Sequence, residues 1–189
     1  MVSFSKEITV IEVYPNLFVG SEYDIHAFSL LAEKRTIEKC PAVVSSYISA
    51  HYVQAAKEPF HREAVKYVTR GAPKDHPEYL VARRSNRIIL NLVDVPESKA
   101  QYIPDEALDA AVDYIQWCVH SQFKPILVHC NQGVSRGPSI ALMFLMKHTN
   151  FAEGLSLFES VEDKFRTLYP AYNPQGIRVK TRERFEALK

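Results

Sequence analysis

The sequence predicts an α/β domain, with a central mixed, mostly parallel sheet of about five strands flanked by helices. Short runs of apolar and β-branched residues alternate with longer segments of helical periodicity, which is the order expected of this fold class. The apolar run 126–128 is followed at Pro138 by a stretch that is apolar all round, which predicts a strand and then a buried helix. The 189 residues, 47% of them apolar, are expected to form a single domain, residues 1–189.

The amino-terminal segment predicts a hairpin that leads into a helix. Residues 8–14 are rich in β-branched side chains and predict a strand. Pro15-Asn16 predicts a turn into a second short strand, residues 17–19. Ser21 and Asp24 then have the spacing of a helix N-cap and the residue that bonds back to it.

The next segment is less regular. Residues 42–47 predict a strand, and Cys40 beside it is interpreted as a packing residue rather than a redox partner of Cys130, because no spacing links the two cysteines. Residues 48–86 are predicted to be the least regular part of the chain, since they are interrupted by Pro59, Gly71, Pro73 and Pro77.

The second half predicts a strand at 87–92, a loop at 93–97 and a helix at 104–120. The helix has an apolar stripe at three- and four-residue spacing, which makes Cys118 a core residue. The stripe is Leu108, Ala111, Val112, Ile115, Cys118 and Val119. Two more helices are predicted near the end, one marked by Leu155, Phe158, Val161, Phe165 and Leu168, and one capped by Asn173-Pro174 and ending near Leu188.

The turn between the strand at 126–128 and the helix at Pro138 carries the chemistry. It leads from the carboxyl end of a strand to the amino end of a helix, where α/β proteins bind anions. Dipoles at such a turn stabilise a thiolate, so Cys130 is a candidate nucleophile. Arg136 can reach over the mouth of the turn, where its guanidinium can hold two oxygens of a phosphoryl group.

Other residues of the turn complete this interpretation. Gly133 permits a backbone conformation in which successive N–H groups point inward. His129 can hold the backbone of Cys130 through a hydrogen bond. The predicted phosphate cradle is formed by the backbone N–H groups of Asn131, Gln132, Gly133, Val134, Ser135 and Arg136.

The pattern His-Cys-x-x-Gly-x-Ser-Arg at residues 129–136 resembles the signature of the cysteine-dependent protein tyrosine phosphatase superfamily, within it the dual-specificity branch. Residues 13–21 are similar to the opening hairpin of dual-specificity phosphatases, which is a second, independent match. The block Lys-Glu-Pro-Phe-His-Arg at residues 57–62 is similar to a segment of prokaryotic members of that branch. The resemblance covers nearly the whole chain and is weakest over residues 48–86.

The resemblance implies that Cys130 attacks a phosphomonoester and that water hydrolyses the resulting phosphocysteine, with no metal or organic cofactor. It also implies an aspartic acid on a loop before the cysteine, which protonates the leaving oxygen. Asp94, 36 residues before Cys130, fits this role. Glu97 remains a rival, because the loop is longer than is common in the family. Asp105 is less suitable, since it falls in the first turn of a predicted helix.

Gly137 departs from the family pattern, in which a Ser or Thr after the arginine bonds the cysteine sulfur. Without that hydroxyl we expect a less stabilised thiolate, slower turnover and accumulation of the phosphoenzyme. Ser135 precedes the arginine and is not assumed to substitute. The alternative function is therefore a slow-turnover or inactive phosphatase that binds phosphoproteins without efficient hydrolysis.

Positive charge is concentrated in residues 51–87, which hold eight Lys or Arg and four acids. One interpretation is a basic insertion that flanks the active site and attracts phosphorylated substrate, with Lys57, His61 and Arg62 as first candidates. The other is a solvated helix face, and the sequence favours neither. The three histidines of this segment lack the spacing of metal ligands, so no metal site is predicted.

The expected substrates are phosphoproteins, with phosphotyrosine first and phosphoserine or phosphothreonine as further possibilities. The variable positions Asn131, Gln132 and Val134 include no lysine, which disfavours polyanionic phosphoinositide and RNA triphosphate substrates. A rhodanese-like sulfur carrier also uses a cysteine loop, but the flanking histidine and arginine and the upstream aspartate favour a phosphatase.

Bulk composition restricts the partners further. A net charge of +1 gives no global field that would attract nucleic acid or membranes. Three cysteines without close spacing suit a reducing compartment, and neither a signal-peptide pattern nor an 18-residue apolar run occurs. We therefore expect a cytoplasmic protein that binds neither nucleic acid nor membranes, with signal-independent export left open. The oligomeric state is not predicted.

Overall fold

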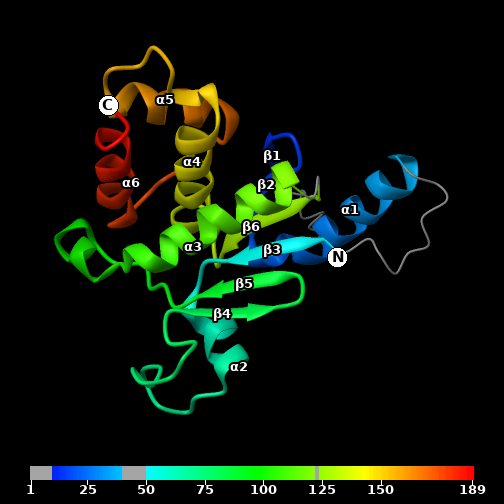
Figure 1. The fold of residues 1–189 in the computed structure, drawn as a ribbon, viewed down its shortest axis with the longest axis vertical. Coiled ribbons are helices and arrows are strands. Elements are labelled where there is room, and N and C mark those ends of the chain that lie inside the picture. The colour runs from blue at the N-terminus through cyan, green and yellow to red at the C-terminus, as the bar shows by residue number, and fades with distance from the viewer. Residues whose placement is uncertain (1–9, 40–49, 122–123) are drawn as a thin grey trace, which may run out of the picture.

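The computed structural model describes residues 10–39, 50–121 and 124–189, and it confirms an α/β fold (Figure 1). Its sheet has six strands, one more than expected, in the order β1-β2-β6-β3-β5-β4. The four inner strands are parallel, and both edge strands pair antiparallel. The strands are β1 (Ile11–Tyr14), β2 (Leu17–Ser21), β3 (His51–Gln54), β4 (Val81–Arg84), β5 (Arg87–Leu90) and β6 (Ile126–Cys130).

In the described parts of the chain, six α-helices and several shorter helical turns surround this sheet. The helices are α1 (Ile25–Lys39), α2 (Arg62–Val65), α3 (Asp105–Gln116), α4 (Arg136–His148), α5 (Phe158–Leu168) and α6 (Ile177–Glu186). The shorter turns are Glu22–Asp24, Lys57–His61, Glu97–Tyr102, Trp117–Ser121 and Asn150–Ala152. In the part of the chain that the structure describes, none of the helices has the length and apolar content needed to span a membrane.

Two apolar layers lie on opposite faces of the sheet, because successive strand residues point to opposite sides. The larger core lies between one face of the sheet and the four helices α3, α4, α5 and α6. The sheet contributes Leu17, Val53 and Val128 to it. The smaller core lies on the other face, where α1 contributes Phe28 and Ala32. In Figure 1, α4, α5 and α6 stand together above α3.

The centre of the sheet positions the functional loop. All five residues of β6 are buried, and β6 lies between β2 and β3. Residues 137–146 of α4 are also buried, which confirms the predicted strand followed by an enclosed helix. Since the four inner strands are parallel, their carboxyl ends share one edge, and the loop after Cys130 begins in the middle of that edge.

Several local predictions are confirmed. Ser21 and Asp24 form a reciprocal capping box, and Ser21 Oγ also donates to Asp24 Oδ2 at 2.7 Å. The apolar stripe of α3, including Cys118 in the turn that follows it, is buried. The strand predicted at 42–47 and Cys40 lie outside the described residues.

Two predictions about element bounds are wrong. Residues 48–86 contain β3 and β4, which were not expected. β3 carries polar residues at both ends, yet His51 and Gln54 are 2% and 4% exposed, because neighbouring strands and helices cover them. The last helix begins at Ile177 rather than at Asn173, whose backbone N–H instead donates to the carbonyl of Val134 at 2.8 Å.

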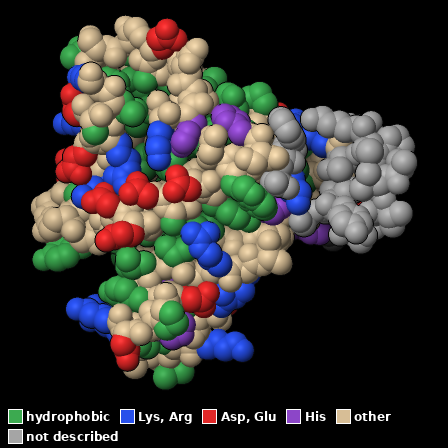
Figure 2. Space-filling view, in the orientation of Figure 1, with side chains coloured by type: hydrophobic (Ala, Val, Ile, Leu, Met, Phe, Trp, Pro, Cys, Tyr) green, Lys and Arg blue, Asp and Glu red, His purple; other side chains and the backbone are tan. Residues whose placement is uncertain are grey.

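Surface charge is unevenly distributed over these elements (Figure 2). In this view, acidic side chains gather over α3, whose exposed acids include Asp109 and Asp113. Lys and Arg side chains project from the region below, which holds α2 and β4. The charge distribution therefore favours an anionic ligand near the edge of the sheet formed by β5 and β4, rather than near α3.

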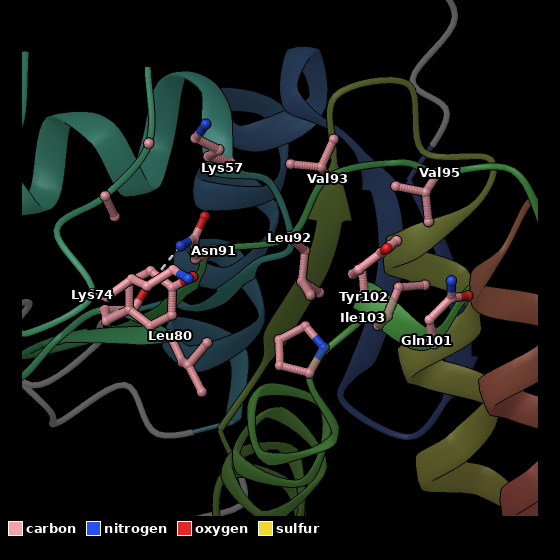
Figure 3. A pocket seen from close by; sticks show the side chains of 14 residues that line it. Lys57, Lys74, Leu80, Asn91, Leu92, Val93, Val95, Gln101, Tyr102 and Ile103 are labelled. Carbon is pink, nitrogen blue, oxygen red and sulfur yellow. Dashed lines mark hydrogen bonds between the residues drawn. The ribbon is translucent and has the colours of Figure 1, made fainter. Parts of the chain in front are cut away.

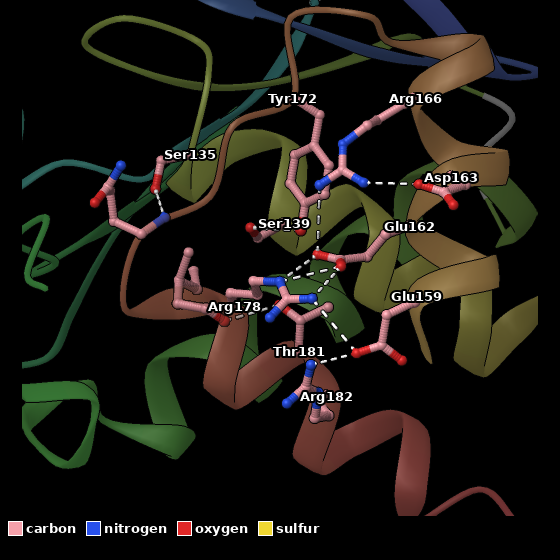
Figure 4. A network of polar contacts seen from close by, with 12 residues as sticks. Ser135, Ser139, Glu159, Glu162, Asp163, Arg166, Tyr172, Arg178, Thr181 and Arg182 are labelled. Carbon is pink, nitrogen blue, oxygen red and sulfur yellow. Dashed lines mark hydrogen bonds and ion pairs between the residues drawn. The ribbon is translucent and has the colours of Figure 1, made fainter. Parts of the chain in front are cut away.

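A buried ion pair joins α5 to α6 (Figure 4). The Glu162 side chain is 2% exposed, and its two carboxylate oxygens accept from Arg178 Nε at 2.9 and 3.0 Å. Glu159, which is largely exposed, contacts Arg178 at 3.6 Å. The pair therefore anchors the start of α6, directly after the segment that reaches the functional loop.

Replacing Glu162 by Ala is expected to lower the free energy of unfolding by about 3 kcal/mol, because it leaves the half-buried Arg178 without its main partner. Urea unfolding measures this loss. The control is Glu159→Ala, which removes an exposed carboxylate from the same helix and should cost much less, because water screens an exposed pair. Equal losses in the two variants would contradict the importance of the buried pair.

Candidate active site

The predicted loop lies where the sequence placed it. Cys130 is the last residue of β6 and is 2% exposed, and Arg136 is the first residue of α4. Gly133 has a φ of +76°, and a Cβ built on it would lie 2.8 Å from the backbone carbonyl of Gly20. Only glycine meets both conditions, so the loop can curl tightly against the end of β2.

The carbonyl groups of the loop are bound by the surrounding protein. The bonds are Ala55 N–H to His129 (2.8 Å), Glu22 N–H to Asn131 (3.3 Å), Tyr169 O–H to Gly133 (2.8 Å) and Asn173 N–H to Val134 (2.8 Å). By contrast, the N–H groups of residues 131–135 donate to no other group within the described residues. The loop therefore presents a set of unused donors, as an anion cradle requires.

Arg136 is held beside this cradle. Its Nη1 donates to the Leu92 carbonyl at 3.1 Å and its Nη2 to Asn131 Oδ1 at 2.9 Å. Its Nε is buried and has no partner among the described residues. Two protein acceptors thus orient the guanidinium, while Nε–H and one N–H on each terminal nitrogen remain for a ligand.

Asn131 connects the loop to two other segments. Its Nδ2 donates to Glu22 Oε2 and to the backbone carbonyl of Glu58, each at 2.9 Å. Because its Oδ1 accepts from Arg136, one side chain ties the arginine to the turn after β2 and to the turn after β3. This positioning role of the side chain was not predicted from the sequence, where Asn131 counted as a variable loop position and as a backbone N–H donor of the cradle.

The structure brings Asp94 to the loop. Its Oδ1 accepts a hydrogen bond from Ser135 Oγ at 3.0 Å, and Ser135 Oγ in turn accepts from the backbone N–H of Gln175 at 3.2 Å. Glu97 begins the next helical turn and makes no such contact in the described chain. Asp105 lies in the first turn of α3 and is paired with Lys180 and Arg184.

The segment between α5 and α6 holds the acid-bearing loop in place. The backbone N–H of Gly176 donates to the carbonyl of Val95 at 2.7 Å. A Cβ built on Gly176 would lie 2.6 Å from that oxygen and 2.7 Å from the carbonyl oxygen of Pro96. Any larger residue would therefore displace one of the two segments. A glycine shortly before a helix was the available signal in the sequence, and it was not used.

His129 is fully buried and packs edge-on against Phe60, with ring centroids 5.1 Å apart. Burial lowers the pKa of His129 to about 4, although the backbone of Cys130 and the charge of Asp24 favour the protonated ring. Neither ring nitrogen reaches a partner at hydrogen-bond geometry within the described residues. The Cys130 backbone therefore still acts on the ring, as expected, but at a geometry looser than that of an ordinary hydrogen bond, and a neutral His129 supports the loop mainly by packing.

Gly137 lies where α4 meets β6. A Cβ built on it would be 3.0 Å from the carbonyl carbon of His129 and 3.1 Å from the backbone nitrogen of Cys130. Such contacts are tighter than ordinary packing allows, so a side chain here requires a shift of a few tenths of an ångström. A glycine at position 137 therefore lets α4 approach β6 closely, and the same glycine is the reason that this position carries no hydroxyl.

The basic segment, residues 51–87, approaches the loop 130–136 mainly through its backbone. The side chains of Lys57, His61 and Arg62, which were candidates for phosphate binding, contribute less. The Lys57 N–H donates to the Leu92 carbonyl at 2.8 Å, next to the contact from Arg136. His61 is fully buried and bonds the Glu78 carbonyl at 2.9 Å. Arg62 is paired with Glu58 and with backbone carbonyls of residues 67–70. His61 and Arg62 are therefore structural here, which corrects their expected role in phosphate binding.

The chain is similar to phosphatases in both sequence and structure. The family model "Dual specificity phosphatase, catalytic domain" matches residues 47–172. A curated relative, dual specificity protein phosphatase 5 of Rattus norvegicus, is 35% identical over 66 residues, which are 35% of this chain and 17% of that protein. The match thus spans less than a fifth of the relative.

Solved structures show the same fold. A mouse putative dual specificity phosphatase, crystallised with zinc tungstate, has a TM-score of 0.60 at 17% identity and covers 100% of this chain and 93% of its own. Human DUSP28 has a TM-score of 0.54 at 20% identity, with 95% of each chain covered. At these identities the likeness concerns the fold alone.

Replacing Gly176 by Ala is expected to lower the free energy of unfolding by about 1–3 kcal/mol, because the new Cβ overlaps the carbonyls of Val95 and Pro96. Faster hydrogen exchange of the Gly176 amide should accompany the loss. Gly71→Ala is the control, since a Cβ there meets nothing within 4 Å. If both variants were equally stable, the close contact would not constrain the acid-bearing loop.

Proposed function

The chain belongs to the dual specificity phosphatase catalytic-domain family, and on that premise we propose that residues 1–189 act as one cysteine-dependent phosphatase domain. The proposed reaction is hydrolysis of phosphomonoesters on proteins, with phosphotyrosine as the first substrate and phosphoserine or phosphothreonine as further ones. One observation supports it most: within the described chain, the N–H groups of residues 131–135 donate to no other group, while the carbonyls of Asn131, Gly133 and Val134 are bound by other segments.

The first proposed step transfers the phosphoryl group to the enzyme. The Cys130 thiolate attacks phosphorus, an S–P bond forms and the P–O bond to the substrate breaks. The free N–H groups and Arg136 hold the non-bridging oxygens, whose negative charge they stabilise. Asp94 donates a proton to the leaving oxygen, and the Ser135 hydroxyl on Oδ1 leaves Oδ2 to carry that proton.

The second proposed step releases phosphate. Water attacks the phosphocysteine, the S–P bond breaks and the thiolate of Cys130 is restored. Asp94, now deprotonated, accepts a proton from the water, so inorganic phosphate leaves and the starting state returns. Neither step calls for a metal or organic cofactor. Among the described residues, no three or more His, Cys, Asp or Glu side chains are grouped so that they could hold a metal ion.

A second candidate function is phosphoprotein binding with little turnover. It is favoured by Gly137, which provides no hydroxyl to the cysteine sulfur, and by the close packing of Gly137 on the backbone of His129 and Cys130. In that case the cradle and Arg136 would still bind the phosphoryl group, and the phosphocysteine would persist. The two functions differ in the second step alone.

An aryl phosphate assay separates the two functions, with phenol and phosphate release followed from the first turnover. We expect sustained release of both products, its loss in Cys130→Ser and a decrease of about 10²–10⁴-fold in Asp94→Ala. Glu97→Ala is the matched control in the same loop and should keep the wild-type rate. A burst of phenol without continued phosphate release would instead support the binding function, and no burst at all would remove the covalent mechanism.

Gly137 is tested by a pair of variants that share a Cβ. Both Gly137→Ala and Gly137→Ser should lose about 1–3 kcal/mol of stability, because each places that atom against the backbone of β6. Because the two variants differ only by the serine hydroxyl, the difference between their rates of phosphocysteine hydrolysis measures the effect of that hydroxyl. We expect faster phosphate release in the serine variant. Equal rates of phosphocysteine hydrolysis in the two would show that the missing hydroxyl does not limit turnover.

A further inference from the structure

A pocket opens beside the catalytic loop, between the segment 57–80 and the loop 91–104 (Figure 3). Its volume is about 610 Å³. In Figure 3, Lys74, Leu80 and Asn91 lie on one side and Tyr102 and Ile103 on the other, with Leu92 between them. The residues that form it thus come from the basic segment and from the loop that carries Asp94.

The pocket combines an apolar lining with positive charge. Leu80, Val93 and Tyr102 contribute accessible apolar surface, and Lys57 and Lys74 supply two cations. None of its 14 lining residues, all within the described chain, is acidic. Lysines beside a low-dielectric surface favour an anionic group that also has aliphatic atoms to bury.

The two lysines are unequal. Lys57 is constrained, because its Nζ donates to the Arg70 carbonyl and lies 3.8 Å from Glu58 Oε1. Lys74 is exposed and forms no ion pair with any acid in the described part of the chain. Lys74 is therefore the cation that remains available to a ligand.

The pocket is contiguous with the proposed catalytic groups. Leu92 lines it, and the carbonyl of the same residue accepts from Arg136. Val93 and Val95, which flank Asp94 in sequence, also line it. One strand, β3, separates β5 from β6, so the ends of β5 and β6, which lead to the pocket and to the catalytic loop, lie about 10 Å apart at ordinary strand spacing. An extended peptide covers that distance in about three residues.

We infer that this pocket is a specificity site, which binds an anionic side chain about three residues from the phosphorylated residue of a protein substrate. The inference rests on the proposed phosphatase function. The anionic group can be a carboxylate or a second phosphoryl group, since both offer oxygens to Lys74. The aliphatic stem of that side chain packs against Leu80 and Val93, while the phosphorylated residue occupies the cradle.

The test uses phosphotyrosine peptides of otherwise uncharged sequence, in which one Asp is placed at each position up to four residues on either side. We expect kcat/KM to peak with Asp about three residues away and on one side only, by about fivefold. Replacing the Asp at the best position by phosphoserine then shows whether the pocket prefers a carboxylate or a second phosphoryl group. A rate that does not depend on where Asp stands would overturn the inference.

Lys74→Ala tests the cation directly. We expect it to lower the ratio of kcat/KM for the best peptide to kcat/KM for an aryl phosphate by about fivefold, an effect that weakens as salt is added. Lys147→Ala is the control: it removes the same charge at the far end of α4, about 17 Å along the helix from the loop. Equal loss in the two variants would also overturn the inference.

A binding measurement keeps the inference separate from the proposed function. The same peptides, labelled with a fluorophore, are bound to Cys130→Ser and followed by anisotropy. If no substrate is turned over but binding still peaks at one Asp position and falls in Lys74→Ala, the specificity site stands and the hydrolytic function fails. A flat binding profile together with normal turnover removes the specificity site alone.

Discussion

The catalytic loop depends on hydrogen bonds to its carbonyl groups. Each peptide unit of the loop has one donor and one acceptor, and the donors can face a ligand only if the acceptors are satisfied elsewhere. Here the acceptors are bound by the turn after β2, by the end of β3 and by the segment after α5. The anion cradle is therefore built by parts of the chain more than a hundred residues apart, and it is as rigid as their packing allows.

The segment between α5 and α6 has the largest share in this arrangement. Tyr169 and Asn173 bind the catalytic loop, Gln175 binds Ser135, and Gly176 binds the loop that carries Asp94. The Glu162 and Arg178 pair fixes α6 against α5 directly behind these contacts. The proposed nucleophile and the proposed acid thus share one scaffold, and this explains how a residue on an exposed loop can lie against the buried Ser135.

The proposed catalytic groups and the proposed specificity site occupy different parts of the sheet edge. The groups proposed for bond breaking stand at the end of β6 and the start of α4, whereas the pocket with Lys57 and Lys74 follows β3 and β5. His61 and Arg62 build the basic segment from within, through Glu78 and Glu58, and so leave the lysines to face a substrate. The proposed role of Gly137 is separate, because it concerns how fast the proposed phosphocysteine would break down rather than what binds.

The sequence by itself determined the features that depend on neighbouring residues. The buried β6, the enclosed α4, the apolar stripe of α3, the capping box at Ser21 and the left-handed Gly133 all follow from local periodicity or from a single backbone requirement. The family signature added the expected roles of Cys130, Arg136 and Asp94, which remain predictions. Only the tertiary structure decided that polar-ended β3 is buried in the sheet, that Ser135 and Gly176 hold the acid-bearing loop, and that His61 is structural. Those features depend on partners 17 to 81 residues away or on burial by other elements, and no local pattern encodes such contacts.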